Sequence, residues 1–248
     1  MPRPQQPEQQ APPVQRIRIR YAKRGRMRFA SHRDFSRAFE RALVRARVPM
    51  AYSSGFNPHP RISYAGAAPT GAASEAEYLE IGLAEEVDPA TLRAALDTSL
   101  PEGLDVIEMV PSAGDALADR LEASVWRMEV SGVDPDELRG AVAALLATDE
   151  VLVERMTKKG LRSFDARAAV VRLAVVGVDD GDPRCAILDV VLRHGTPSVR
   201  PDDVLAALRE TSGLSVGAAL QRRLAQGPLD ERGGTVGDPL APDRDAAD

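Results

Sequence analysis

The order in which strand-like and helix-like patterns follow one another from residue 16 constrains the fold more than any other feature. Basic and apolar residues alternate over 16–23 (RIRIRYAK), which is typical of a strand with one buried face. A helical spacing of apolar residues begins after Ser31, and Pro49 ends it. Two strands, a helix and a last strand are predicted next, over 61–65, 76–83, 88–99 and 103–110. This βαββαβ order is typical of a ferredoxin-like unit.

A similar order of patterns begins at residue 123. Strands are predicted over 123–131, 150–157, 168–176 and 185–193, and helices over 134–147 and 201–211. Residues 212–225 fit either a final strand or a frayed helix. We therefore predict an α+β protein of two tandem ferredoxin-like halves, with domains over 16–112 and 121–225. A single long α+β sheet is the alternative.

Both ends of the chain have compositions that disfavour folding. Residues 1–15 are rich in proline and glutamine, and residues 226–248 are rich in glycine, proline and aspartate. Such segments bury too little apolar surface to offset the entropy of ordering, so we predict a disordered head and a disordered tail.

Composition also excludes several kinds of chemistry. Cys185 is the one cysteine, so the chain has no internal disulfide and no cysteine-based iron–sulfur or zinc site. No Gly-Lys-Ser/Thr phosphate loop occurs, and no run of about 18 apolar residues marks a membrane span. The N-terminal residues do not resemble a secretory signal. We expect no metal, no cofactor, no membrane partner and a cytoplasmic location.

The net charge of −5 hides a strong asymmetry along the chain. Residues 1–64 contain fourteen Arg and Lys against three Asp and Glu, whereas residues 65–150 contain four against nineteen. Because the local field decides which ligands approach, an acidic average does not argue against a nucleic-acid partner.

The helix predicted after Ser31 presents an unusual row of cations. At 100° per residue its apolar side chains gather on one face, and four arginines gather on the other: Arg33, Arg37, Arg41 and Arg45. Like charges four residues apart repel by about 0.2–0.5 kcal/mol a pair, so a helix selected for stability alone would alternate acids with bases. We interpret this face as a phosphate-binding surface, extended by Arg26, Arg28 and Arg61. The alternatives are a solvated surface and a dock for the acidic middle segment.

The loop after the helix adds groups suited to nucleic acid. Tyr52 and Phe56 are candidates for stacking on bases, and Asn57 and His59 for hydrogen bonds to base edges or phosphate. In the alternative interpretation the two aromatic side chains fill the core. A basic hairpin over residues 156–162, which contains Lys158, Lys159 and Arg162, is a second candidate for contact with RNA, and a solvated turn is the alternative.

His32, in the first turn of the helix, is a candidate general acid or base for RNA cleavage. No second histidine, Lys–Tyr pair or nucleophile stands at an obvious spacing from it, so the alternative is a histidine that only contacts solvent or phosphate.

Three blocks resemble the radical SAM-linked protein family over about residues 16–195: SHRDFSRAFERALVRA, YSSGFNPHPRISYA and SEAEYLEI. The resemblance implies a partnership with a radical S-adenosylmethionine enzyme. The chain lacks the three-cysteine motif of such an enzyme, so it is not that catalyst itself. More loosely, the same region is similar to the RAMP-type CRISPR endoribonucleases, which have two ferredoxin-like domains and a catalytic histidine on an N-terminal helix, where His32 lies here. Their C-terminal glycine-rich loop has no match in RLAQGPLDERGG.

Three hypotheses follow from these observations. The leading one is an accessory protein, not itself an enzyme, that binds tRNA or ribosomal RNA and works with a radical SAM enzyme that modifies it. The second is a metal-independent endoribonuclease that uses His32. The third is a protein–protein adaptor whose basic face docks on an acidic patch of the radical SAM partner.

Overall fold

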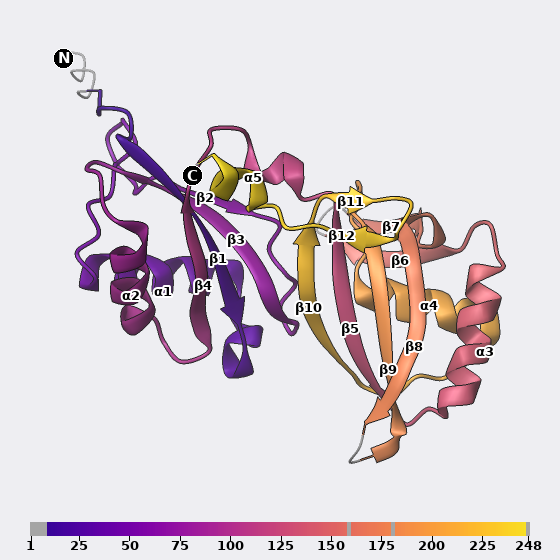
Figure 1. The fold of residues 1–248 in the computed structure, drawn as a ribbon. Coiled ribbons are helices and arrows are strands. Elements are labelled where there is room, and N and C mark those ends of the chain that lie inside the picture. Colours follow the sequence, from indigo (N-terminus) through magenta and orange to yellow (C-terminus); the bar gives the residue numbers. More distant parts are fainter. Residues whose placement is uncertain (1–8, 158–159, 180–181, 247–248) are drawn as a thin grey trace, which may run out of the picture. The chain divides into compact units, whose positions relative to one another are not determined.

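The computed structural model describes residues 9–157, 160–179 and 182–246 of the chain. The chain folds into two compact units (Figure 1). The first unit contains Met1–Ala118 together with Leu240–Asp248, and the second contains Asp119–Pro239. Both contain helices and antiparallel strands, so the predicted mixture of α and β structure is confirmed.

The first unit is built on an antiparallel sheet. Its elements are β1 (Gln15–Lys23), η1 (Gly25–Phe29), α1 (His32–Arg45), β2 (Ile62–Ala65), β3 (Ala73–Leu83), α2 (Pro89–Ser99), β4 (Leu104–Pro111) and α5 (Ala241–Asp245). Strand β1 lies between β3 and β4, and β2 pairs with β3. Residues 9–14 of the predicted disordered head form no helix or strand, and residues 1–8 lie outside the described residues.

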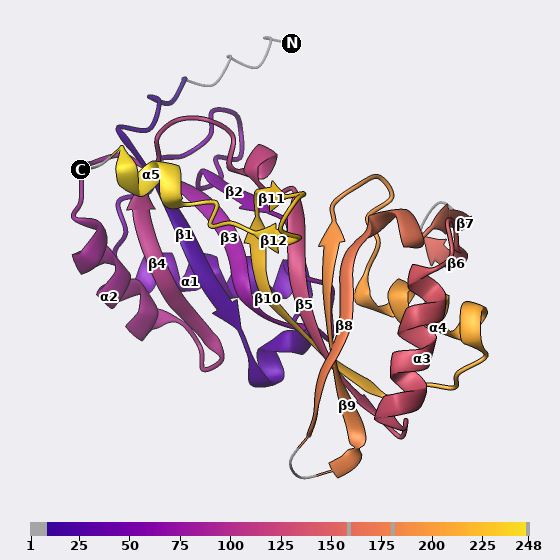
Figure 2. The same ribbon diagram turned by 45° about the vertical axis from the view of Figure 1, so that its right-hand side comes forward.

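The core of the first unit forms where α1 and α2 cover one face of this sheet (Figure 2). Alternation along β1 turns Ile17, Ile19 and Tyr21 to the helices. Phe35 of α1 stacks on the Tyr21 ring with centroids 4.6 Å apart. Phe39 is almost fully buried, which contributes about 1.5–3 kcal/mol. The apolar face predicted for this helix is therefore confirmed.

The opposite face of the sheet contains a buried arginine, Arg18. Alternation alone places its side chain in solvent, but the guanidinium is fully buried by the C-terminal segment. Its Nη1 donates to both carboxylate oxygens of Asp243 in α5, at 2.7 and 2.8 Å. Nε donates to Glu80 at 3.1 Å, and Asp115 supplies a third carboxylate.

The disordered tail predicted from Gln226 is therefore a wrong prediction. Residues 226–246 end strand β10 and form β11, β12 and α5. The physical reason is tertiary: a charge removed from water must be compensated, and Asp243 supplies the compensation for Arg18. Leu240, fully buried, adds an apolar anchor.

The second unit has a sheet of four antiparallel strands in the order β10-β5-β9-β8. The elements from the end of the first unit onward are η2 (Leu117–Arg120), β5 (Ala123–Ser131), α3 (Pro135–Leu146), β6 (Leu152–Thr157), β7 (Gly160–Asp165), η3 (Arg167–Ala169), β8 (Val170–Asp179), β9 (Asp182–Arg193), α4 (Pro201–Ser212), β10 (Ala219–Gly227), β11 (Leu229–Asp230) and β12 (Thr235–Val236). The ambiguous stretch 212–225 thus contains most of a strand, β10.

The strands β6 and β7 pair where a basic hairpin was predicted, but they form a separate two-stranded sheet after α3. Arg155 of β6 fastens it to the N-terminus of α4 by an ion pair with Asp203 and a 3.0 Å hydrogen bond to the Ser198 carbonyl. The guanidinium also lies 4.9 Å from the centroid of the Phe164 ring. Among the described helices, none is long and apolar enough to cross a membrane.

Candidate nucleic-acid interface

The basic face of α1 is positioned by a well-formed helix start. Ser31 is the N-cap: its Oγ accepts from the Asp34 backbone N–H at 3.2 Å and donates to the Asp34 carboxylate at 2.6 Å. The hydroxyl hydrogen bond from Ser31 holds the pKa of Asp34 below its ordinary value, and Arg33 and Arg37 lower it further. Asp34 is therefore ionised and committed to the cap.

The four predicted arginines of α1 are all exposed, on the side away from the core. Arg45 donates to the Ser99 carbonyl at the end of α2. Within the described part of the chain, Arg33, Arg37 and Arg41 form no ion pair closer than 4 Å. These three cations are thus free to meet an anionic ligand.

The same face has an apolar contribution that the sequence reasoning did not identify. Val44 is 74% exposed and lines a shallow depression of about 510 Å³ together with Arg37, Glu40, Arg41 and Arg45. The spacing of Val44 from Arg37 and Arg41 would have placed it on this face, but an isolated exposed valine carries little signal. Glu40 is the acid within the row.

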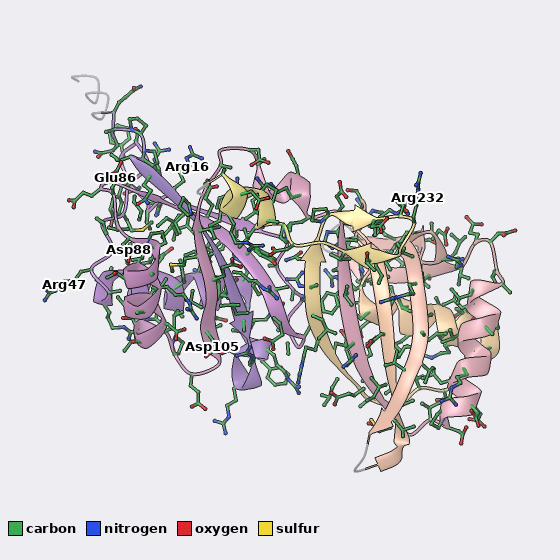
Figure 3. All side chains as sticks on the ribbon, in the orientation of Figure 1. Arg16, Arg47, Glu86, Asp88, Asp105 and Arg232 are labelled. Atoms are coloured by element: carbon green, nitrogen blue, oxygen red, sulfur yellow. The ribbon has the colours of Figure 1, made fainter. Side chains whose placement is uncertain are left out.

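The residues before α1 extend the positive surface. Arg26 is exposed on η1, and the Arg28 guanidinium lies 4.6 Å from the centroid of the Phe29 ring, which is 59% exposed. An arginine on an exposed aromatic ring forms a flat group of the kind that stacks on bases. After the helix, Arg47 has φ 53° and projects away from the sheet (Figure 3). Phe29 and Arg47 were not among the predicted site residues.

The loop between α1 and β2 is closed at its base like a hairpin. Tyr52 bridges Pro60, and the Ser53 backbone N–H donates to the His59 carbonyl at 2.9 Å. The Arg61 Nε donates to the Tyr52 carbonyl at 3.1 Å, so Arg61 braces the loop and is only half-exposed. These contacts join the two ends of the loop at its base.

The side chains of this loop are displayed to solvent. Phe56 is 72% exposed and Tyr52 is 43% exposed, so neither fills the core. Asn57 and His59 are exposed as well. The alternative in which the two rings are core residues is therefore excluded, and all four predicted loop residues remain available to a ligand.

His32 is exposed beside the arginine row, and two neighbours orient its ring. Nδ1 lies 3.4 Å from Ser36 Oγ, and the ring meets Tyr64 edge to face at 4.7 Å. Ser36 gives its own proton to the His32 carbonyl at 2.9 Å, so its oxygen is placed to accept from Nδ1–H. That tautomer leaves Nε2 with its lone pair. Burial raises the pKa of Tyr64, which keeps the phenol protonated.

Of the predicted second basic site, only Arg162 is described. It is exposed on β7 in the second unit, and Lys158 and Lys159 lie outside the described residues. Among the described residues no cluster of three or more His, Cys, Asp or Glu side chains is arranged to hold a metal ion.

Residues 16–201 match the model of a protein family described as "Uncharacterized protein conserved in bacteria (DUF2344)". Because this match spans well over half of the 248 residues, the chain belongs to that family. No curated protein matches the chain.

Proposed function

We propose that this protein is an accessory RNA-binding protein that works with a radical SAM enzyme in the modification of tRNA or ribosomal RNA. The observation that carries RNA binding is the row of three exposed arginines on α1 without ion-pair partners among the described residues. The exposed aromatic side chains before and after the helix, Phe29, Tyr52 and Phe56, supply stacking surfaces.

The architecture supports this proposal. In the first unit the element order is βαββαβ, and the strands lie in the order β4-β1-β3-β2. In the second unit the order is the same once the β6–β7 hairpin is set aside. We infer that both units are ferredoxin-like, an arrangement in which helices cover one face of an antiparallel sheet. Fold alone does not assign a function, so the argument rests on the exposed side chains.

The radical SAM partner rests on the resemblance of residues 16–195 to radical SAM-linked proteins. A partner enzyme would supply the radical chemistry, and this chain would hold the RNA. The single cysteine, Cys185, is buried and is consistent with this division of labour.

Salt dependence tests the arginine row directly. Each neutralised phosphate adds about −0.7 to the slope of log K against log salt for a single strand, and about −0.9 for a duplex. We expect the triple variant Arg33→Gln, Arg37→Gln, Arg41→Gln to weaken binding to total cellular RNA and to flatten the slope by about 2–3. The measurement is fluorescence anisotropy across a salt series.

The matched control replaces three exposed arginines of the second unit, Arg139, Arg209 and Arg232, by glutamine. It changes the net charge equally and should leave the slope nearly unchanged. If both triple variants lower affinity equally, a general charge effect replaces the assigned site. If the wild type binds weakly with a flat salt response, the basic face is a protein-docking surface and the adaptor function replaces RNA binding.

One observation favours a second candidate function, metal-independent RNA cleavage. His32 is held with Nε2 free beside cations that would bind phosphate, which is the geometry of a general base. His32→Ala should then abolish cleavage of structured RNA while binding is retained. If the wild type cleaves no structured RNA, this candidate is removed.

A further inference from the structure

A depression of about 250 Å³ in the first unit brings together two arginines from different elements. Arg16 projects from the start of β1 (Figure 3), and Arg61 closes the aromatic loop just before β2. Ser63 and Glu80 complete its polar wall. Two guanidinium groups on one small depression are suited to an anion, because each presents a planar fork of donors.

The floor of the depression depends on Gly82. A Cβ built there would lie 2.8 Å from Pro13 Cγ, closer than real side chains tolerate, and 3.3 Å from Arg61 Cβ, which is a tight contact. The backbone of Gly82 is not in the left-handed region, so its conformation does not demand glycine. Space is therefore the constraint, and any larger residue would fill the depression from below.

Charge at this end of the depression is only partly neutralised. Glu80 accepts from Arg16 at 3.1 Å, but it also accepts from Arg18 at 3.1 Å and from Ser112 at 2.9 Å. Arg18 is also paired with Asp243 and Asp115, so among the described residues that line the first depression one carboxylate, Glu80, faces the two cations Arg16 and Arg61. Arg61 uses its Nε for the Tyr52 carbonyl, and its side chain lines the depression.

A second depression of about 310 Å³ adjoins the first, because Arg16, Ser63 and Glu80 line both. It extends to the 114–118 segment, where Asp115 is exposed. The resulting groove is cationic at the Arg61 end and acidic at the Asp115 end. A ligand with an anionic head and an uncharged or amino-bearing body would therefore bind in one direction.

We propose that this groove binds the end of an RNA strand, with a terminal phosphate between Arg16 and Arg61 and its nucleoside directed toward the 114–118 segment. The first depression is smaller than the roughly 300–1,000 Å³ of sites for drug-sized ligands, which suits a single phosphate. A terminal phosphate carries about −1.5 to −2 charges and matches two arginines better than an internal phosphodiester does. This inference rests on the proposed RNA-binding function and names a strand end as the element recognised.

The test uses three versions of one short single-stranded RNA: with a 5′-phosphate, with a 3′-phosphate, and with neither. In anisotropy measurements on the full chain, one phosphorylated version should bind about tenfold more tightly than the bare strand, as charge-assisted hydrogen bonds predict. Arg16→Gln and Gly82→Ala should each remove this preference and retain binding of the bare strand. Arg37→Gln is the control: it should weaken all three strands by a similar factor and leave the preference intact.

The outcomes separate this inference from the proposed function. No preference in the wild type, or a preference that survives both variants, overturns the terminal-phosphate site. If adenosine monophosphate binds the groove but the protein binds none of the RNA strands, the groove is a site for a free nucleotide and not for an RNA end. Inorganic phosphate that competes as well as adenosine monophosphate overturns the nucleoside part of the groove. The exposed side chain of Arg16 makes Arg16→Gln the safe variant if Gly82→Ala fails to fold.

Discussion

Single residues of this protein are fixed by chains of donors and acceptors, and His194 gives the clearest case. Its Nδ1 lies 2.7 Å from the Leu121 carbonyl, which can only accept, so Nδ1 holds the proton. Nε2 lies 3.1 Å from Ser124 Oγ, which also accepts from Trp126 Nε1 at 2.8 Å. Every member of this chain is satisfied when the imidazole is neutral. Burial lowers the pKa of His194, and the nearby Arg223 lowers it further.

Stability should therefore depend on pH through His194. Because its folded-state pKa lies below the unfolded value of about 6.5, the unfolded chain binds the proton first. The contribution of neutral His194 to the free energy of unfolding is fully present above about pH 6.5. It is lost as the pH falls from there through the folded-state pKa of His194. Urea unfolding at pH 7.5 and at lower pH should show this loss, and His194→Gln should remove it at a cost of about 1 kcal/mol at pH 7.5.

His59 provides the control, because it is exposed in the loop. His59→Gln should leave the pH dependence of unfolding unchanged. A wild type whose stability is flat between pH 7.5 and the acid limb would contradict the assignment of a neutral His194.

Phe56 tests stacking independently of phosphate binding. Its ring is 72% exposed, so Phe56→Ala should change the free energy of unfolding by no more than about 0.5 kcal/mol. RNA affinity should fall by about 1–3 kcal/mol with the salt slope unchanged, since stacking neutralises no phosphate. Phe56→Trp should restore affinity. If Phe56→Ala instead flattens the salt dependence and leaves the affinity at fixed salt unchanged, Phe56 positions the arginines and does not stack on a base.

Among the elements, α5 supplies the buried counter-charge of Arg18. Asp243→Ala should destabilise the protein toward the lower end of about 3–5 kcal/mol, because Arg18 stays buried and loses its fully buried counter-charge, while Glu80 and Asp115 remain beside it. Asp245→Ala, at an exposed position of the same helix, should change stability by less than about 0.5 kcal/mol. Equilibrium unfolding in urea measures both. Equal effects of the two variants would contradict the role of the buried pair.

A double variant sharpens this test. Arg18→Met with Asp243→Leu removes both charges and replaces them with apolar groups. It should be less destabilised than Asp243→Ala alone, because no uncompensated buried charge remains.

The sequence predicts those elements whose signals are local. Ser31 and Pro49 bound the stretch that contains α1, and Asp88 and Asp134 cap α2 and α3 where they were expected. Strand β7 was not among the predicted strands because four of its six residues are exposed, which leaves no alternation to detect. Helix α5 was missed because its reason to form, Arg18, lies 225 residues away. The burial of Arg18 could not be predicted either, because its partner Asp243 is equally distant in the sequence.

Some residues of the candidate site could likewise be predicted from local sequence, and others could not. The exposed face of α1 follows from helical spacing, so its four arginines were predictable. The depression between Arg16 and Arg61 depends on the pairing of β1 and β2 with β3 and on the space above Gly82. Neither is visible in local sequence, which is why Arg16 was not among the predicted residues.

At the scale of the whole molecule, the first unit is assembled from two separated parts of the chain, and the second is formed by one continuous part. A fragment of residues 119–239 contains a complete sheet with its helices and should give a dispersed NMR spectrum. A fragment of residues 1–118 lacks Asp243 and Leu240 and should show weak amide protection in β1. Adding a peptide of residues 237–246 should restore that protection. A fragment 1–118 as protected as the full chain would contradict the dependence on α5.

The contact between Arg18 and Asp243 also determines when the nascent chain can complete the first unit. Asp243 is synthesised 225 residues after Arg18, which at about 5–20 residues per second is a delay of roughly 11–45 s. The second unit, translated within that interval, contains all of its own strands before the first unit can be closed. The order of synthesis and the order of completion of the two units are therefore reversed: the first unit begins before the second and is finished after it.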